Sequence, residues 1–230
     1  MRSRFSLLVL WCFVWVFIST LLFSPGHKVM AESLQGSYSA SLWGGYYLPK
    51  NSTFQEVYSD DGEFAGFLEF SKTWSSQIVV TLGGGWIHFS GRQVNPNASQ
   101  IDTDNEKYSA DSAKMTLVPG YLQFSYLFRY SQEQKLVPYL GAGLDAWGFQ
   151  EKMKDGDTVT GAKYGYHGLV GVRLLLDWLD PDAAQSSLQE YGIDNTYLIL
   201  EARWLRIDDF GGIGLDLSGP LYRVGLLWEF

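Results

Sequence analysis

The sequence predicts an all-β fold: an eight-stranded antiparallel transmembrane β-barrel with a short periplasmic helix between strands six and seven. Three observations predict it. Eight segments alternate apolar with polar or small residues, and several exceed the ~9–11 residues that a tilted strand needs to cross a bilayer. Aromatic residues make up 16% of the chain, and apolar faces carry them near their ends. The connections alternate between short and long, as in outer-membrane barrels.

In chain order the predicted strands are 36–48, 62–73, 76–90, 113–130, 136–150, 162–176, 195–206 and 219–230. In the fourth, Leu122, Phe124 and Tyr126 share one face, whereas Gln123 and Arg129 share the other. This period of two is the pattern of a strand with lipid on one side and a polar lumen on the other. A soluble periplasmic sandwich or a lipocalin-like barrel is the rival fold, because alternation alone fits both.

The connections place the two ends of the barrel. Strands two and three, and strands four and five, are joined by a few residues, whereas the links at 49–61, 91–112, 151–161 and 207–218 are long and polar. Short turns face the periplasm and long loops face outward in outer-membrane barrels. With an even strand count, both termini lie on the turn side.

One turn-side connection is long and predicts a helix over 181–191. Asp180 is a suitable N-cap, Pro181 suits the first helical position, and Gly192 suits the stop. Apolar residues follow at helical spacing: Ala184, Leu188 and Tyr191. The helix is expected on the membrane-facing rim or over the barrel mouth, and a tolerated decorated turn is the simpler interpretation.

Residues 1–31 predict a cleaved signal peptide, with export through the Sec pathway and a cut after Ala31. Two arginines precede the uncharged run 7–23, and Pro25 and Gly26 end it. The run is longer than the usual ~7–15 residues, so a retained membrane anchor is the alternative. Residues 32–230 then form the outer-membrane β-barrel domain.

The mature chain is acidic and free of cysteine. Three of the 17 basic residues and the single cysteine, Cys12, lie in the signal segment, which leaves 14 bases against 25 acids. This balance argues against a nucleic-acid partner, which needs a basic surface. Disulfides contribute nothing to the stability of the mature chain. Its length of about 200 residues fits one domain.

Two stretches carry a resemblance: "VPYLGAGLDAW" at 137–147 and "VGLLWEF" at 224–230. With the signal and the eight strands, they resemble the small bacterial outer-membrane barrels of the OmpA, OmpX and OmpW type. The resemblance implies an outer-membrane location in contact with outer-membrane lipids and lipopolysaccharide. It also implies a C-terminal signal read by the barrel-assembly machinery, made of Tyr222, Val224, Leu226, Trp228 and Phe230.

Charged residues on the inward positions predict a lumen charge network. Its members are Glu69, Arg129, Asp145, His167, Arg173, Glu201, Arg203, Arg223 and Glu229. Their signs nearly balance, and buried charges need partners. Because ~8 strands enclose an interior that side chains can fill, we expect a largely plugged lumen.

These observations predict a structural or interaction role and no enzyme activity. The alternatives are a channel for small solutes, including a hydrophobic solute leaving laterally into lipid, and an outer-membrane lipid-modifying hydrolase. For the latter, His88 and Ser90 are similar to the His-x-Ser pair of lipid A deacylases, but Gly91 stands where that family has Asn. No catalytic residue, metal site or cofactor is predicted.

Overall fold

The fold was analysed in a computed structural model, which describes residues 37–58, 62–94, 108–131, 134–152, 158–212 and 214–230. Its strands are β1 (Tyr38–Tyr47), β2 (Glu63–Ser75), β3 (Ile78–Val94), β4 (Tyr108–Leu127), β5 (Leu136–Lys152), β6 (Thr158–Leu175), β7 (Asn195–Arg206) and β8 (Gly219–Glu229). Its described helices are α2 (Ser52–Tyr58) and α3 (Pro181–Tyr191). Neither helix is long and apolar enough to cross a bilayer. The predicted signal segment and its cut at Ala31 lie outside the described residues.

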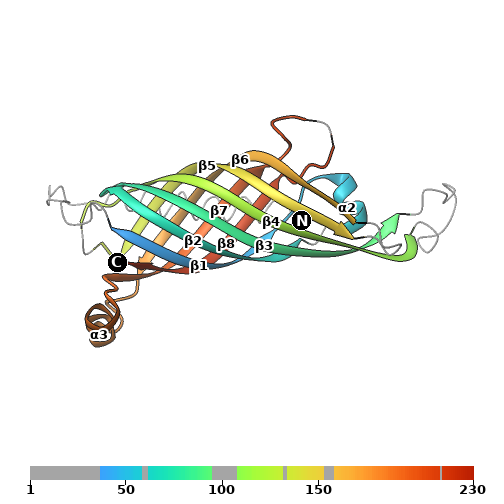
Figure 1. The fold of residues 1–230 in the computed structure, drawn as a ribbon. Coiled ribbons are helices and arrows are strands. Elements are labelled where there is room, and N and C mark those ends of the chain that lie inside the picture. Colours follow the sequence, from blue (N-terminus) through green and yellow to red (C-terminus); the bar gives the residue numbers. More distant parts are fainter. Residues whose placement is uncertain (1–36, 59–61, 95–107, 132–133, 153–157, 213) are drawn as a thin grey trace, which may run out of the picture.

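The strands form one closed antiparallel barrel in sequence order (Figure 1). β8 closes it against β1, with a register that runs from Ser39 opposite Glu229 to Tyr47 opposite Leu221. Phe230 N–H donates to the Tyr38 carbonyl at 2.8 Å, which continues the ladder to the last residue. The prediction of an eight-stranded barrel is therefore confirmed, and closure leaves no edge between β1 and β8.

Each strand separates an apolar exterior from a packed interior. In β2, the exposed side chains of Phe64, Leu68 and Phe70 alternate with the buried side chains of Phe67 and Glu69. This alternation confirms the predicted faces. It follows from the pleat, which sends successive side chains to opposite sides of a sheet.

β3 and β4 extend further toward the long loops than the sequence predicted. The expected ends were residues 90 and 113, whereas the strands reach Val94 and begin at Tyr108. Their ladder persists to the pair Val94–Tyr108, with a register irregularity after Arg92. Polar residues that were assigned to a loop therefore continue the hairpin beyond the apolar wall, because backbone pairing does not depend on an apolar face.

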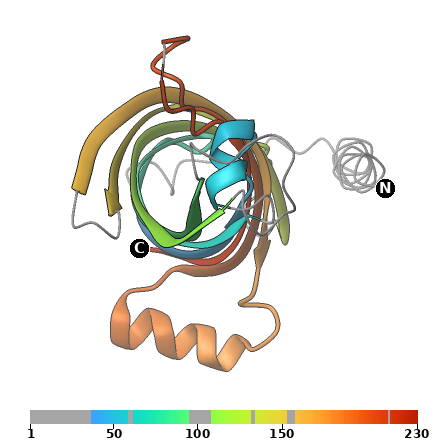
Figure 2. The same ribbon diagram turned by 90° about the vertical axis from the view of Figure 1, so that its right-hand side faces the viewer.

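The helix predicted over 181–191 is confirmed as α3. The Asp180 side chain accepts a hydrogen bond from Ala183 N–H at 3.0 Å, and Gly192 ends the helix in the left-handed region at φ 69°. Figure 2, which looks along the barrel, shows α3 beside the barrel wall and not over the mouth. No residue of α3 is buried, so the barrel core does not depend on it.

α2 was not predicted, because residues 49–61 were assigned to a polar loop. Asn51 caps it, since its Oδ1 accepts a hydrogen bond from Phe54 N–H at 3.0 Å. The helix crosses the barrel opening at the long-loop end (Figure 2). Phe54 and Tyr58, one turn apart, are buried at its inner side.

Candidate functional site in the barrel lumen

The middle of the lumen holds a cluster of two carboxylates and two guanidinium groups. Arg223 bridges the carboxylates, with Nη1 2.8 Å from Glu69 Oε1 and Nη2 2.6 Å from Glu201 Oε1. Arg203 Nη2 lies 3.1 Å from Glu201 Oε1 and 3.6 Å from Glu69 Oε1. All four side chains are buried. Strands β2, β7 and β8 supply them, so the cluster joins β2 to β7 and β8, with which it is not paired in the barrel ladder.

Neutral side chains complete this central cluster. Glu69 accepts hydrogen bonds from Trp43 Nε1 at 2.7 Å and from the Tyr121 hydroxyl at 2.5 Å. The Tyr139 hydroxyl donates to Glu201 Oε2 at 3.0 Å. Rings also cover the cations: the Arg223 guanidinium lies 4.0 Å from the centre of the Trp43 ring. Each buried charge therefore has an ion partner together with hydrogen-bonded or ring partners, which offsets the cost of desolvation.

A second ionic cluster closes the turn end of the lumen. Glu229 Oε1 accepts hydrogen bonds from Arg129 at 3.0 Å and from Arg173 at 3.3 Å. Arg129 also donates to the Tyr197 hydroxyl at 2.9 Å, and the three charged groups are buried. Two cations thus share one carboxylate next to the last residue of the chain.

Asp145 and His167 form a buried pair near the central cluster. Their Oδ2 and Nδ1 atoms lie 2.6 Å apart, and Trp147 Nε1 donates to Asp145 Oδ1 at 3.3 Å. The Nε2 atom of His167 has no hydrogen-bond partner among the described residues. Because Gly143 lies against this ring, where an added Cβ would come within 2.5 Å of Cε1, the pair is tightly enclosed.

An aromatic layer fills the lumen at the long-loop end, under α2. The Phe54 ring packs edge-on against Phe89 with centroids 5.0 Å apart, and the Tyr47 ring does the same against Trp147 at 5.4 Å. The Tyr58 hydroxyl donates to Glu151 Oε1 at 2.5 Å. These contacts fasten α2 to β3 and β5 across the long-loop opening of the barrel.

The loop between β7 and β8 is fastened to β6 at the rim. Lys163 Nζ lies 2.6 Å from Asp209 Oδ2, and Tyr164 N–H donates to Asp209 Oδ1 at 2.9 Å. The hydrogen bond from Lys163 holds the pKa of the Asp209 carboxyl below its usual value. Asp209 and Phe210 both have positive φ, 53° and 59°, which is uncommon for residues other than glycine.

The structure brings most of the predicted site residues together. The nine residues of the proposed network are all buried and lie in three groups, around Glu69 and Glu201, around Glu229, and at Asp145. The four arginines pair with Glu69, Glu201 and Glu229, and the fourth carboxylate, Asp145, pairs with His167. The predicted assembly residues Val224, Leu226 and Phe230 are exposed on the outer wall.

The pair considered for hydrolase chemistry, His88 and Ser90, does not lie in the lumen. His88 and Ser90 are exposed on the outer face of β3. His88 Nδ1 lies 3.3 Å from the Thr116 hydroxyl on β4. No cluster of three metal-ligating residues occurs in the part of the chain that the structure describes.

The predicted charge network did not include the uncharged side chains that complete it. Trp43, Tyr121 and Tyr139 occupy inward positions of their strands, so the same alternation that located the charges could have located them. The aromatic layer was missed for another reason: Phe54 and Tyr58 lie in a segment without strand periodicity. The sequence signal for this helix is the capping residue Asn51, followed by two aromatic residues that are four positions apart.

Solved structures with the same architecture support this description. One is the outer membrane protein OprG of Pseudomonas aeruginosa, at 13% identity and a TM-score of 0.55, with 89% of this chain and 98% of that chain covered. The fold is that of the small outer-membrane barrels. Neisserial surface protein A matches at 12% identity and a TM-score of 0.53, covering 85% and 100% of the two chains.

A third match is Ail of Yersinia pestis, the attachment invasion locus protein, in complex with the heparin analogue sucrose octasulfate. It has 10% identity and a TM-score of 0.51, with 85% of this chain and 99% of that chain covered. No protein-family model and no curated protein sequence matches the chain. At these identities the comparisons establish the fold alone.

Proposed function

We propose that the protein is an exported barrel of the bacterial outer membrane with a closed lumen, and that it acts through its outer surface and not as a channel. The single observation that carries this proposal is the filled lumen. Two ionic clusters and an aromatic layer occupy it from the turn end to α2. An interior of ~8 strands leaves little more room than side chains need.

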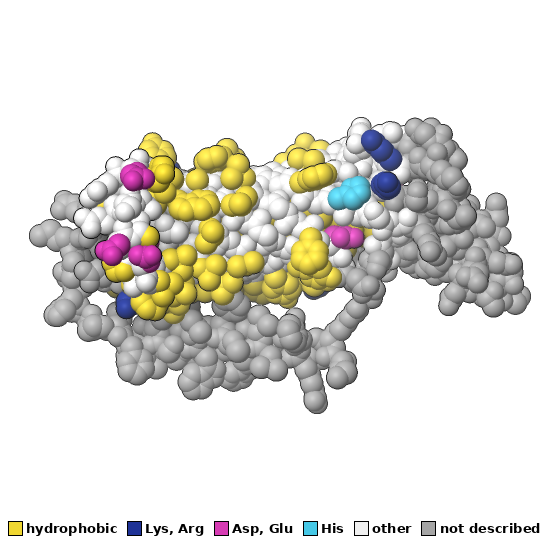
Figure 3. Space-filling view, turned by 90° about the horizontal axis from the view of Figure 1, so that it is seen from below, with side chains coloured by type: hydrophobic (Ala, Val, Ile, Leu, Met, Phe, Trp, Pro, Cys, Tyr) yellow, Lys and Arg dark blue, Asp and Glu magenta, His cyan; other side chains and the backbone are white. Residues whose placement is uncertain are grey.

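The exterior supports the membrane location. Figure 3 shows apolar side chains gathered in a broad band across one face of the barrel, with charged side chains toward its two ends. Large apolar side chains are exposed on the outer wall of the barrel, including those of Phe64, which is 80% exposed, and Trp74, which is 70% exposed. A soluble protein rarely exposes so large a contiguous apolar surface, whereas a bilayer requires it.

Two further proposals concern biogenesis. Residues 1–31 are removed after export, because they have the basic and apolar regions of a signal peptide. The alternating residues Tyr222 to Phe230 are read by the barrel-assembly machinery, which their position on the closing strand β8 supports.

Fractionation and gel migration test the location. The mature protein is expected in the outer-membrane fraction, and an unboiled sample is expected to migrate differently from a boiled one on a denaturing gel. A mature protein that stays in the soluble periplasmic fraction would refute the proposal.

Conductance in a planar bilayer tests the closed lumen. The refolded protein is expected to show no discrete current steps under conditions in which a porin shows them. Regular steps from the wild-type protein would instead support the solute-channel alternative. Mass spectrometry of lipid A from cells with wild-type protein and with Ser90→Ala tests the hydrolase alternative, and we expect identical lipid A from both.

A further inference from the structure

The outer wall of β4 and β5 carries two lysines that face each other across the strands. Lys114 on β4 lies directly opposite Lys152 on β5 in the register. Both side chains are exposed, and neither has an ion-pair partner among the described residues. Like charges at directly opposite positions destabilise a sheet. An anion placed between the two ammonium groups would turn this repulsion into attraction.

The position of the two lysines along the strands, relative to the apolar side chains, indicates which anions are within their reach. The outward residues of β4 are apolar from Phe124 to Val118, and then change to Thr116 and Lys114. Lys114 therefore lies about 13 Å along the strand beyond the last apolar side chain. In the proposed membrane this is the level of the outer-leaflet headgroups. Figure 3 shows basic side chains and a histidine past the apolar side chains at this end, together with an acidic side chain.

Below the lysines, the same two strands form an apolar hollow of about 390 Å³. Its floor is the small pair Gly120 and Ala146, which are opposite each other in the register. Leu122 and Leu144 form one wall, and Tyr164 forms another together with Phe210. Between the hollow and the lysines, Gly148 stands opposite the exposed Val118 in the register, and a Cβ added to Gly148 would meet no atom closer than 3.9 Å.

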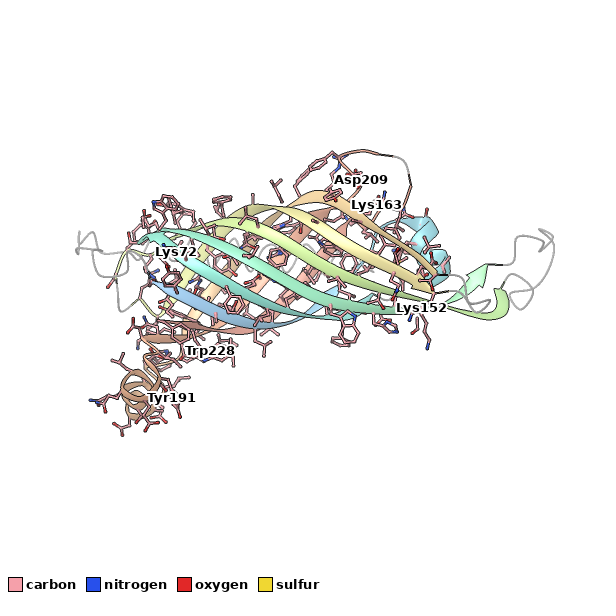
Figure 4. The ribbon with its side chains drawn as sticks, in the orientation of Figure 1. Lys72, Lys152, Lys163, Tyr191, Asp209 and Trp228 are labelled. Atoms are coloured by element: carbon pink, nitrogen blue, oxygen red, sulfur yellow. The ribbon has the colours of Figure 1, made fainter. Side chains whose placement is uncertain are left out.

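Phe210 lies at this hollow because the backbone at Asp209 and Phe210 adopts a conformation that is uncommon for residues other than glycine. It is 64% exposed, and both it and Asp209 have positive φ. The bonds from Asp209 to Lys163 and Tyr164 hold this turn, and the Phe210 ring stacks on Tyr166 with centroids 6.3 Å apart. Figure 4 shows Lys163 and Asp209 together at the rim. Strained conformations of this kind persist where surrounding contacts hold them, often at binding sites.

We propose that the outer wall of β4 and β5 binds one phosphorylated lipid of the outer leaflet, with a phosphate between Lys114 and Lys152 and an acyl chain in the hollow over Gly120 and Ala146. Lysine ammonium groups bind phosphate as point charges. The site is complementary to such a lipid. Its cationic part, Lys114 and Lys152, lies at the depth of the headgroups, and its apolar hollow lies at the depth of the acyl chains. The proposal rests on the outer-membrane location proposed above.

Lipid binding to the full mature chain in non-ionic micelles tests the proposal by native mass spectrometry. The probe is a deep-rough lipopolysaccharide that carries both lipid A phosphates, compared with the same lipid after dephosphorylation. The variant K114Q/K152Q is expected to bind the phosphorylated probe about tenfold or more weaker, and K114R/K152R to retain binding. The matched control K72Q/K135Q neutralises two exposed lysines at the turn end and is expected to bind as wild type; Figure 4 shows Lys72 and Lys152 at opposite ends.

A second pair of variants tests the apolar half of the site. Ala146→Phe fills the hollow and is expected to weaken binding of both probes, whereas Ala142→Phe, exposed on the same strand outside the hollow, is expected to leave binding unchanged. Gel migration before and after boiling verifies that each variant is folded.

Three results would overturn the proposal. One is unchanged binding by K114Q/K152Q, and another is equal loss in the turn-end control. The third is binding of soluble sucrose octasulfate as tight as that of the lipid, with no effect of Ala146→Phe, which would assign the lysines to a soluble polyanion. Fractionation reports separately on the membrane location, so failure of the site and failure of the proposed function are distinguishable.

Discussion

The central lumen cluster makes a quantitative prediction for the variant Arg223→Met. Methionine has a similar length but no charge, so the change removes the partner that lies 2.8 Å from Glu69 and 2.6 Å from Glu201. Both carboxylates stay buried, with Arg203 as their remaining cation. Removing one member of a buried ion pair costs about 3–5 kcal/mol, mostly because the other charge is left without its partner.

Such a loss is a large part of the ~5–15 kcal/mol by which folded proteins are stable. Reversible unfolding in urea, followed by tryptophan fluorescence in detergent micelles, measures it as a change in the free energy of unfolding. The double variant R223M/E69Q is expected to recover part of the loss, because the one remaining cation, Arg203, then faces the one remaining carboxylate, Glu201, at 3.1 Å.

Arg206→Met is the matched control. Arg206 also donates to a carboxylate, at 3.0 Å from Asp208, but its side chain is 57% exposed. Its pair is screened by solvent, so the free energy of unfolding is expected to stay close to that of wild type. A loss below about 1 kcal/mol for Arg223→Met, or an equal loss for both variants, would refute the argument that the buried network stabilises the barrel.

Three further predictions follow from other contacts. Gly91→Val is expected to displace α2, because an added Cβ would lie 2.1 Å from a backbone oxygen of that helix; faster amide exchange in α2 with an intact barrel would verify it. The lowered pKa of Asp209 means that its bond to Lys163 stabilises the rim above the unfolded value of ~3.9 and is lost as pH falls through the lower folded value. The protection of the Tyr164 amide, measured as its exchange rate relative to the intrinsic rate at the same pH, is therefore expected to fall only below about pH 4; protection that is lost already near neutral pH would contradict this cause. Deleting Phe230 is expected to reduce assembly in cells while refolding into micelles is retained; equal loss in both settings would indicate a structural role instead.

The strands were predictable because one rule of polarity applies to every outward position of the barrel. Leu122 and Gln123 differ in polarity because one is exposed on the outer wall and the other faces the lumen, and the same alternation repeats along each strand. α3 was predictable for local reasons, since Asp180 and Gly192 satisfy its terminal backbone groups within a few residues. Both signals lie within a short window of sequence.

The partners inside the lumen were not predictable in this way. Tyr121 and Arg223, 102 residues apart, share a hydrogen bond of 2.9 Å because the stagger of the closed barrel brings β4 and β8 to the same depth. α2 has only seven residues and depends on contacts such as Tyr58 with Glu151, 93 residues away. Which inward residues meet is a property of closure and register, and alternation alone does not determine either.

The alternation that builds the barrel also separates stability from function. Asp145 points inward to His167, while its neighbour Ala146 points outward to the floor of the apolar hollow. A change at an inward position disturbs a packed, paired interior, and is therefore costly to the fold. A change at an outward position above the apolar belt, such as Lys114 or Lys152, alters what the wall attracts without breaking a core contact. In a barrel with a filled lumen, new binding properties can therefore arise at low cost on the outer wall and loops, which is where Lys114 and Lys152 lie.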